Sequence, residues 1–122
     1  MSTGANAYAR TAQTTASPRD IEAQALLMAA RKLQEVMANW ATTDEGLDDA
    51  LMFNRKLWSI FLGEAMDDSS PQPVEVRQNI ANIGIFILTQ CAALKLKPEV
   101  DKLQSLIDIN RNIAAGLSGR AA

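Results

Sequence analysis

The sequence contains no histidine and only one cysteine. Without histidine there are no Ser-His or Cys-His nucleophile pairs, no usual zinc sites and no Glu-x-x-His metal sites of helical bundles. A single cysteine cannot form a disulfide within the chain, which is typical of a reducing compartment. Glycine-rich loops of the kinds that hold phosphates are also missing. We therefore expect no cofactor and no metal site.

Acid and base groups are few, because the remaining candidates are two pairs of adjacent aspartates, Asp48–Asp49 and Asp67–Asp68. Adjacent side chains do not face each other on a helix, so neither pair makes an acid/base couple by itself. Both pairs lie near expected helix ends, where carboxylates are solvated or complement the helix dipole. We predict no catalytic residues and a protein that is not an enzyme.

The sequence also lacks a large excess of charge of one sign and a long apolar run. The formal net charge is −2, and the basic residues are scattered without the block or stripe that marks a nucleic-acid binder. The most apolar segment, residues 80–94, is shorter than the roughly 20 residues of a membrane span and contains Asn82, Thr89 and Gln90. The polar N-terminus has no secretory signal. These features predict a cytoplasmic protein without membrane insertion.

What is present is helical periodicity in a chain of 122 residues, the length of one domain. A first helix is expected to begin at Ser17 and Pro18 and to run through Trp40, and a second is expected to cover about residues 45–66. A third helix is expected to begin at Pro73. A fourth is expected to begin at Pro98 and to end near Gly116 and Gly119. Thr43 or Asp44 is expected to cap the second helix. The short connections predict an all-α antiparallel bundle of about four helices over residues 17–119. Residues 1–16 have no apolar periodicity and are expected to form a flexible arm.

The third expected helix is apolar on nearly all sides after residue 83. Ile83, Ile87 and Cys91 form its stripe, and Ile85 and Phe86 add apolar surface outside the stripe. A helix of this kind belongs either in the centre of a bundle or against a partner. The sequence leaves these two alternatives open, and we predict that Phe86 contributes to a partner-binding surface.

Two asparagines interrupt otherwise apolar stripes. Asn54 lies between Leu51 and Trp58 in the second helix, and Asn110 lies at the centre of the stripe of the fourth. A buried amide without a hydrogen bond costs about 1–3 kcal/mol, so each side chain needs a partner. Either the amides bond across the bundle, to each other or to a loop backbone, as a structural polar network that fixes register, or they line a groove and bond a visiting chain.

An arginine follows each asparagine, and each is placed about 100° further around its helix. Arg55 and Arg111 are therefore expected at the edges of the two stripes, pointing outward. Trp58 lies on an apolar face and is more often core than interface, but a partly exposed Trp58 beside Arg55 has the chemistry of a binding hot spot. We predict that Arg55, Trp58 and Arg111 border a partner groove, because helices two and four pack against each other.

Five segments together resemble the family of the bacterial flagellar biosynthesis regulator FlaF. They are "NAY" near the start, "SPR" at the first helix, "FNRKLW", "PVEVRQNIANIGIF" and "LIDINRNIAAGL", which occur in order over residues 6–117. The resemblance implies a small, cytoplasmic, non-enzymatic protein with a role in flagellin production. It brings no catalytic or metal residues, and a few extra residues ahead of Asn6 are the main departure.

The partners that the resemblance implies are flagellin before its export and the regulator FlbT, with flagellin mRNA contacted indirectly at most. Flagellin has long amphipathic terminal helices, which a helical bundle with one over-apolar helix is suited to receive in a groove. Two other interpretations remain open: direct RNA-binding control of flagellin translation, and a structural homodimer or partner of FlbT. The sequence does not say which flagellin is bound, or on which helix face.

Overall fold

A computed structural model describes residues 18–40 and 44–119. Over these ranges the chain forms four α-helices: α2 (Pro18–Ala38), α3 (Asp44–Ala65), α4 (Val74–Leu96) and α5 (Val100–Leu117). No strand occurs in these two ranges, so the predicted all-α class is confirmed. The predicted Ser17 and Thr43 caps and the predicted flexible arm of residues 1–16 lie outside the described residues.

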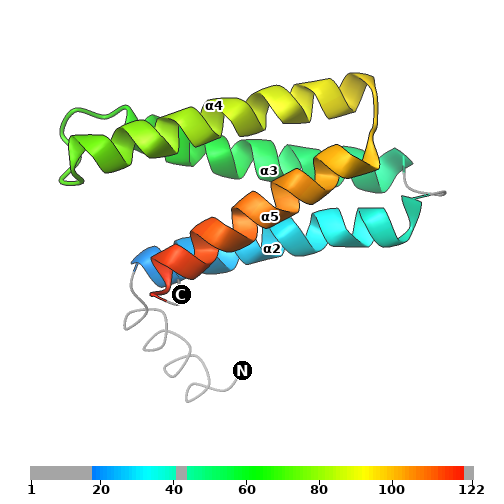
Figure 1. The fold of residues 1–122 in the computed structure, drawn as a ribbon, viewed down its shortest axis with the longest axis horizontal. Helices are drawn as coiled ribbons and strands as arrows, with labels where there is room; N and C mark the ends of the chain where they lie inside the picture. Colours follow the sequence, from blue (N-terminus) through cyan, green and yellow to red (C-terminus); the bar gives the residue numbers. More distant parts are fainter. Residues whose placement is uncertain (1–17, 41–43, 120–122) are drawn as a thin grey trace, which may run out of the picture.

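The four helices form an antiparallel arrangement in which neighbours along the chain alternate in direction (Figure 1). The closest backbone approaches join α2 to α5 and α3 to α4, while α4 and α5 approach each other only briefly. The bundle is thus two packed pairs of helices, and α5 crosses the view at an angle to α4 (Figure 1). The short connections that predicted an antiparallel bundle lead to this arrangement.

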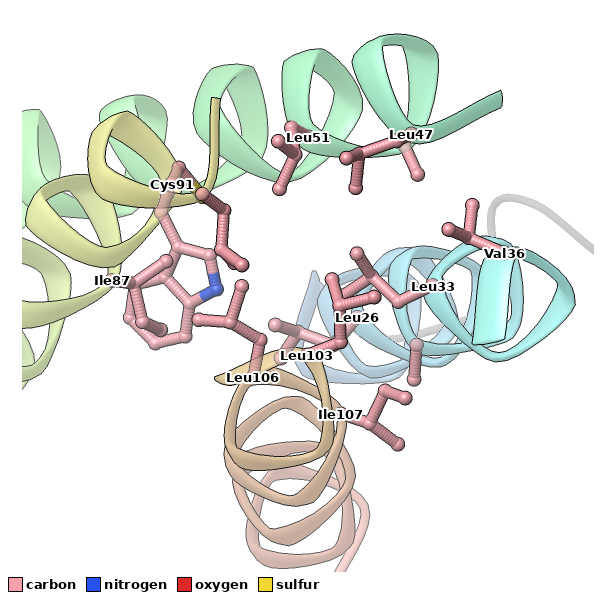
Figure 2. Close-up of a cluster of buried hydrophobic side chains, with 14 of the residues drawn as sticks. Leu26, Leu33, Val36, Leu47, Leu51, Ile87, Cys91, Leu103, Leu106 and Ile107 are labelled. Carbon is pink, nitrogen blue, oxygen red and sulfur yellow. The ribbon is translucent and has the colours of Figure 1, made fainter. Parts of the chain in front are cut away.

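The core lies between the two pairs and receives side chains from all four helices (Figure 2). In α2, Leu26, Ala30 and Leu33 are buried, and Met37 and Trp40, in the last turn and just beyond it, are half-buried. Complete burial of one leucine stabilises the fold by about 1.5–3 kcal/mol. The other large, fully buried apolar side chains include Ile87, Leu94, Leu103, Leu106 and Ile107.

Helix α4 is an outer helix, so the first of its two predicted places, the centre of the bundle, is wrong. Its buried residues are Gly84, Ile87, Cys91 and Leu94, whereas Phe86 is 44% exposed. With 23 residues α4 is also longer than the apolar segment read from the sequence, and by length and composition alone it is able to cross a membrane. Only 22% of its most apolar window is buried in the bundle, which leaves much apolar surface uncovered.

Side-chain contacts and backbone conformation terminate two of the helices. Arg77 of α4 donates from Nε to the carbonyl oxygen of Ala65 at 2.9 Å and forms an ion pair with Asp68 at 3.3 Å, which satisfies the C-terminus of α3. The end of α5 uses Gly119, whose φ of 72° is in the left-handed region that glycine adopts without strain. The predicted stop of the fourth helix thus falls where the sequence placed it.

Gly63 gives a first testable prediction. It lies inside α3, and a Cβ built there meets no atom within 4 Å. Gly63→Ala is expected to raise the free energy of unfolding by about 0.5–1 kcal/mol, because glycine has the greater backbone entropy in the unfolded chain. Gly119→Ala is the matched control and is expected to destabilise, since alanine is strained at positive φ. Urea unfolding of both variants checks the signs, and a destabilised Gly63→Ala contradicts the exposed helical position.

Candidate functional site: a buried amide chain and an open apolar slot

The structure brings Asn54 and Asn110 together at the centre of the bundle. Both side chains are 0% exposed, and Asn110 donates from Nδ2 to Oδ1 of Asn54 at 2.8 Å. The predicted packing of α3 against α5 is wrong, because the close backbone approaches of these two helices are to α4 and α2. The asparagines instead reach across the bundle from helices on opposite corners, which is why their side chains and not their backbones meet.

Two further side chains extend this contact into a chain of four. Trp58 donates from Nε1 to Oδ1 of Asn110 at 2.8 Å, and Asn54 donates from Nδ2 to Sγ of Cys91 at 3.6 Å. Helices α3, α4 and α5 are thereby joined through buried hydrogen bonds. Sequence reasoning missed Trp58 and Cys91 as members. The available signal was that a buried tryptophan N–H needs an acceptor, and that Trp58 lies one turn beyond Asn54.

Of the two interpretations of Trp58, core residue or partly exposed hot spot, the structure shows the core residue, so its predicted place at the border of a partner groove is wrong. Its side chain is 0% exposed, and its ring packs edge-to-face against Phe61 with the centroids 5.3 Å apart. A residue with this environment is part of the core and does not border a groove in the folded protein. The reason is geometric: Trp58 follows Asn54 by four residues and therefore points in nearly the same inward direction.

Arg55 and Arg111 are exposed, as expected, but they do not border one groove. Helices α3 and α5 run in the same direction on opposite corners of the bundle (Figure 1). The same rotation of about 100° therefore carries the two arginines to opposite faces. Arg55 is placed near α4, where its charge acts on the thiol of Cys91.

Cys91 is a buried free thiol. Burial raises its pKa above the ordinary value, while the hydrogen bond from Asn54 and the charge of Arg55 act in the opposite direction. A thiol with a raised pKa stays protonated at neutral pH and is a poor nucleophile. The environment of Cys91 is therefore that of an inert core residue.

Helices α4 and α5 approach each other only briefly, and apolar side chains that are half-buried or exposed lie along the edge between them. The apolar side chains along it are half-buried, Ile80 and Ile83 on α4 and Ile109, Ile113 and Leu117 on α5, and Phe86 follows Ile83 one turn later. We call these six residues the α4–α5 slot. Gln90, one turn beyond Phe86, has a buried Oε1 that accepts no hydrogen bond from the described residues.

A pocket of about 370 Å³, counting its part open to solvent, lies at the end of this slot. Phe61 and Ala65 of α3 contribute apolar surface, as do Ile80, Ile113 and Leu117 of the slot, and Glu22, Glu64 and Gln72 supply polar groups. All four described helices take part in this lining. The pocket could not be found from the sequence, because its residues come from positions 22 to 117.

Glu22 has a perturbed acidity in this pocket. Burial raises its pKa, the nearby charge of Glu64 raises it further, and Arg19 one turn earlier on α2 partly offsets both effects. Elsewhere, within the described ranges, no group of three or more His, Cys, Asp or Glu side chains is placed to hold a metal. Asp48, Asp49, Asp67 and Asp68 are all exposed.

Fold and site together define a class: a small all-α protein with an amide chain across its core and an unclosed apolar edge between two helices. The family model described as "Flagellar protein FlaF" matches residues 4–117, and the chain belongs to this family. Membership gives the protein a role in flagellar biogenesis, in a family of flagellar regulatory proteins that is not a known enzyme family. No curated protein and no solved structure matches the chain.

Proposed function

We propose that the protein is a cytoplasmic, non-enzymatic regulator that binds flagellin in the α4–α5 slot and promotes its production and export together with FlbT. The observation that carries the proposal is the slot itself, because six large apolar side chains along one edge of a small bundle are only partly covered. Contiguous apolar surface of this kind marks protein-binding sites. The members of the family act in flagellar biogenesis, which makes a flagellar protein the partner to test first.

The shape of the slot supports a helical partner. Two antiparallel helices that do not close on each other leave a groove, and an amphipathic helix fills such a groove with apolar anchors at steps of three and four residues. Flagellin's terminal helices have amphipathic stripes that are uncovered before polymerisation. A donor group on the visiting chain is also able to satisfy Oε1 of Gln90, which lacks a partner among the described residues.

Phe86 is the member of the predicted partner-binding set that belongs to the slot. An aromatic side chain that is 44% exposed in the free protein loses much more water on binding than a buried one, and such residues dominate interface energies. Arg55 and Arg111 remain proposed partner contacts on two other faces, and we rank both below Phe86. Asn54, Asn110 and Trp58 act from the core and support the slot without touching the partner.

Phe86→Ala is expected to weaken flagellin binding by about tenfold, the effect of removing a moderate interface anchor. Titration calorimetry of the full chain with purified monomeric flagellin measures the change. Ile85→Ala is the matched control, since Ile85 is on the same helix, is 55% exposed and points away from the slot. Equal binding by wild type and Phe86→Ala removes Phe86 from the interface.

The α4 surface outside the slot favours a second contact, with FlbT or with another copy of this chain. Ile85 and Leu96 are large exposed apolar residues there, with 55% and 88% of their surfaces accessible. Separate pull-downs with flagellin, FlbT and flagellin leader RNA rank the candidates, and light scattering of the isolated chain tests the homodimer. Tight RNA binding that weakens steeply with salt is the result that replaces flagellin by its message as the direct partner.

A further inference from the structure

The pocket at the end of the α4–α5 slot combines an apolar interior with two carboxylates. Phe61 lies in the apolar part of the lining, and Glu22 and Glu64 come from two different helices, α2 and α3. The lining contains no lysine or arginine among the described residues. Among the described residues the acidic partners in ion pairs within 4.0 Å are Asp68 and Glu99. Neither Glu22 nor Glu64 forms such a pair.

The charge of Glu64 opposes ionisation of Glu22, which is partly buried. Burial and the charge of Glu64 both raise the pKa of Glu22, and among the described residues the opposing charge is that of Arg19. From α4 and α5 the pocket receives only uncharged side chains, Ile80, Ile113 and Leu117. A positive charge placed between the glutamates would remove the repulsion and gain two charge-assisted contacts.

We propose that this pocket takes one apolar side chain of an amphipathic partner helix, and that Glu22 and Glu64 bind a lysine or arginine one turn away on the same helix. The inference rests on the proposed function, because it assigns this chemistry to the flagellin segment that enters the slot. It goes further by predicting a basic residue directly beside the apolar stripe of that segment. The pocket is then a selectivity element at the end of a non-selective apolar slot.

The geometry suits one helix carrying both groups. Residues three or four positions apart on a helix have Cβ atoms about 5–6 Å apart, so an apolar side chain and a basic one are presented together. The enclosed part of the pocket is only about 40 Å³ and the rest is open to solvent, which suits the end of a single side chain rather than a free ligand. Two carboxylates are too few for a calcium site, which needs about six to eight oxygen ligands.

Glu22→Gln and Glu64→Gln test the charge directly in the full chain, with purified monomeric flagellin as the probe. Each change is expected to weaken binding by about three- to tenfold at low salt, and the loss is expected to shrink as salt rises. Glu35→Gln is the matched control, because Glu35 is exposed on the same helix as Glu22 and lies outside this pocket. It is expected to bind like wild type.

A second readout separates charge recognition from a folding defect. Removing Glu22 relieves repulsion, so Glu22→Gln is expected to melt at the same or a higher temperature while binding more weakly. Since the cation binds the ionised glutamate, wild-type affinity is also expected to rise as pH increases through the raised pKa of Glu22. The Glu22→Gln variant is expected to lose most of this pH dependence.

The outcomes distinguish the two proposals. If wild type binds flagellin and both glutamine variants bind equally well, the charge-recognition inference is overturned and flagellin binding stands. If wild type does not bind flagellin at all, the proposed function fails and this inference fails with it. Weaker binding by both glutamine variants, with Glu35→Gln unchanged, supports the inference.

Discussion

Trp58→Ala is expected to lower the free energy of unfolding by about 3–5 kcal/mol, the range for truncating a large buried aromatic residue. The side chain is 0% exposed, it packs edge-to-face on Phe61, and its N–H is hydrogen-bonded to Asn110. Truncation therefore leaves a cavity and an unsatisfied acceptor at once. Because small domains are stable by only about 5–15 kcal/mol, this variant is expected to be partly unfolded at physiological temperature.

Urea unfolding followed by far-UV circular dichroism measures the effect. The variant Trp58→Phe separates the contribution of the hydrogen bond from that of the ring packing. Phenylalanine keeps most of the ring volume but lacks the N–H, so it is expected to cost about 1–2 kcal/mol, the typical penalty of a stranded buried acceptor. A Trp58→Ala variant that unfolds within 0.5 kcal/mol of wild type, about the scatter of neutral surface changes, contradicts the buried position.

Asn110→Ala is expected to cost about 2–4 kcal/mol, since it leaves two buried groups without partners at about 1–3 kcal/mol each. Those groups are the N–H of Trp58 and Oδ1 of Asn54. Asn54→Ala is expected to cost less, because it strands the Nδ2 donor of Asn110 and otherwise loses a contact to sulfur, which is a weak acceptor. The order of the two variants follows from their partners, because Asn110 bonds the N–H of Trp58 whereas the second partner of Asn54 is the weakly accepting sulfur of Cys91.

Asn112→Ala is the matched control on α5, because Asn112 is exposed two residues after Asn110. It is expected to change stability by no more than about 0.5 kcal/mol. The double variant of Asn54 and Asn110 is expected to be less destabilised than the sum of the two single variants, since the contact between them is lost only once. Strict additivity is incompatible with the hydrogen bond between the two amides.

The helices and the inward direction of the asparagines were predictable from the sequence, because apolar periodicity fixes which residues share one face of one helix. Proline and glycine positions then placed the helix ends to within a few residues. Asn54 and Asn110 interrupt two stripes at the same phase, which is why their meeting at the core was a reasonable expectation. These inferences need only local geometry.

Neighbour relations between helices were not predictable in the same way. Periodicity shows that a face points inward, but it does not say whether the facing helix is adjacent or on the opposite corner. The expected contact of α3 with α5 failed for this reason, and with it the single groove bordered by Arg55 and Arg111. The apolar pattern of α4 likewise fits a central helix and an outer helix equally well.

The pocket of Glu22 and Glu64 depends entirely on tertiary structure. The two residues are on different helices, and neither is unusual in its local sequence. Their proximity changes the acidity of Glu22 only because α2 and α3 fold against the open end of the slot. Charge patterns of this kind become visible only when the arrangement of helices is known.

An inner amide chain holds the bundle together, and the outer slot is the proposed binding site for the partner. The most direct test is methyl NMR of the isoleucine-labelled full chain during titration with unlabelled monomeric flagellin. We predict that signals of the slot residues Ile80, Ile83, Ile109 and Ile113 shift or broaden, while those of Ile21 and Ile60, which are exposed on α2 and α3, do not. Changes confined to Ile21 and Ile60, with the four slot signals unmoved, contradict the slot as the binding site for flagellin.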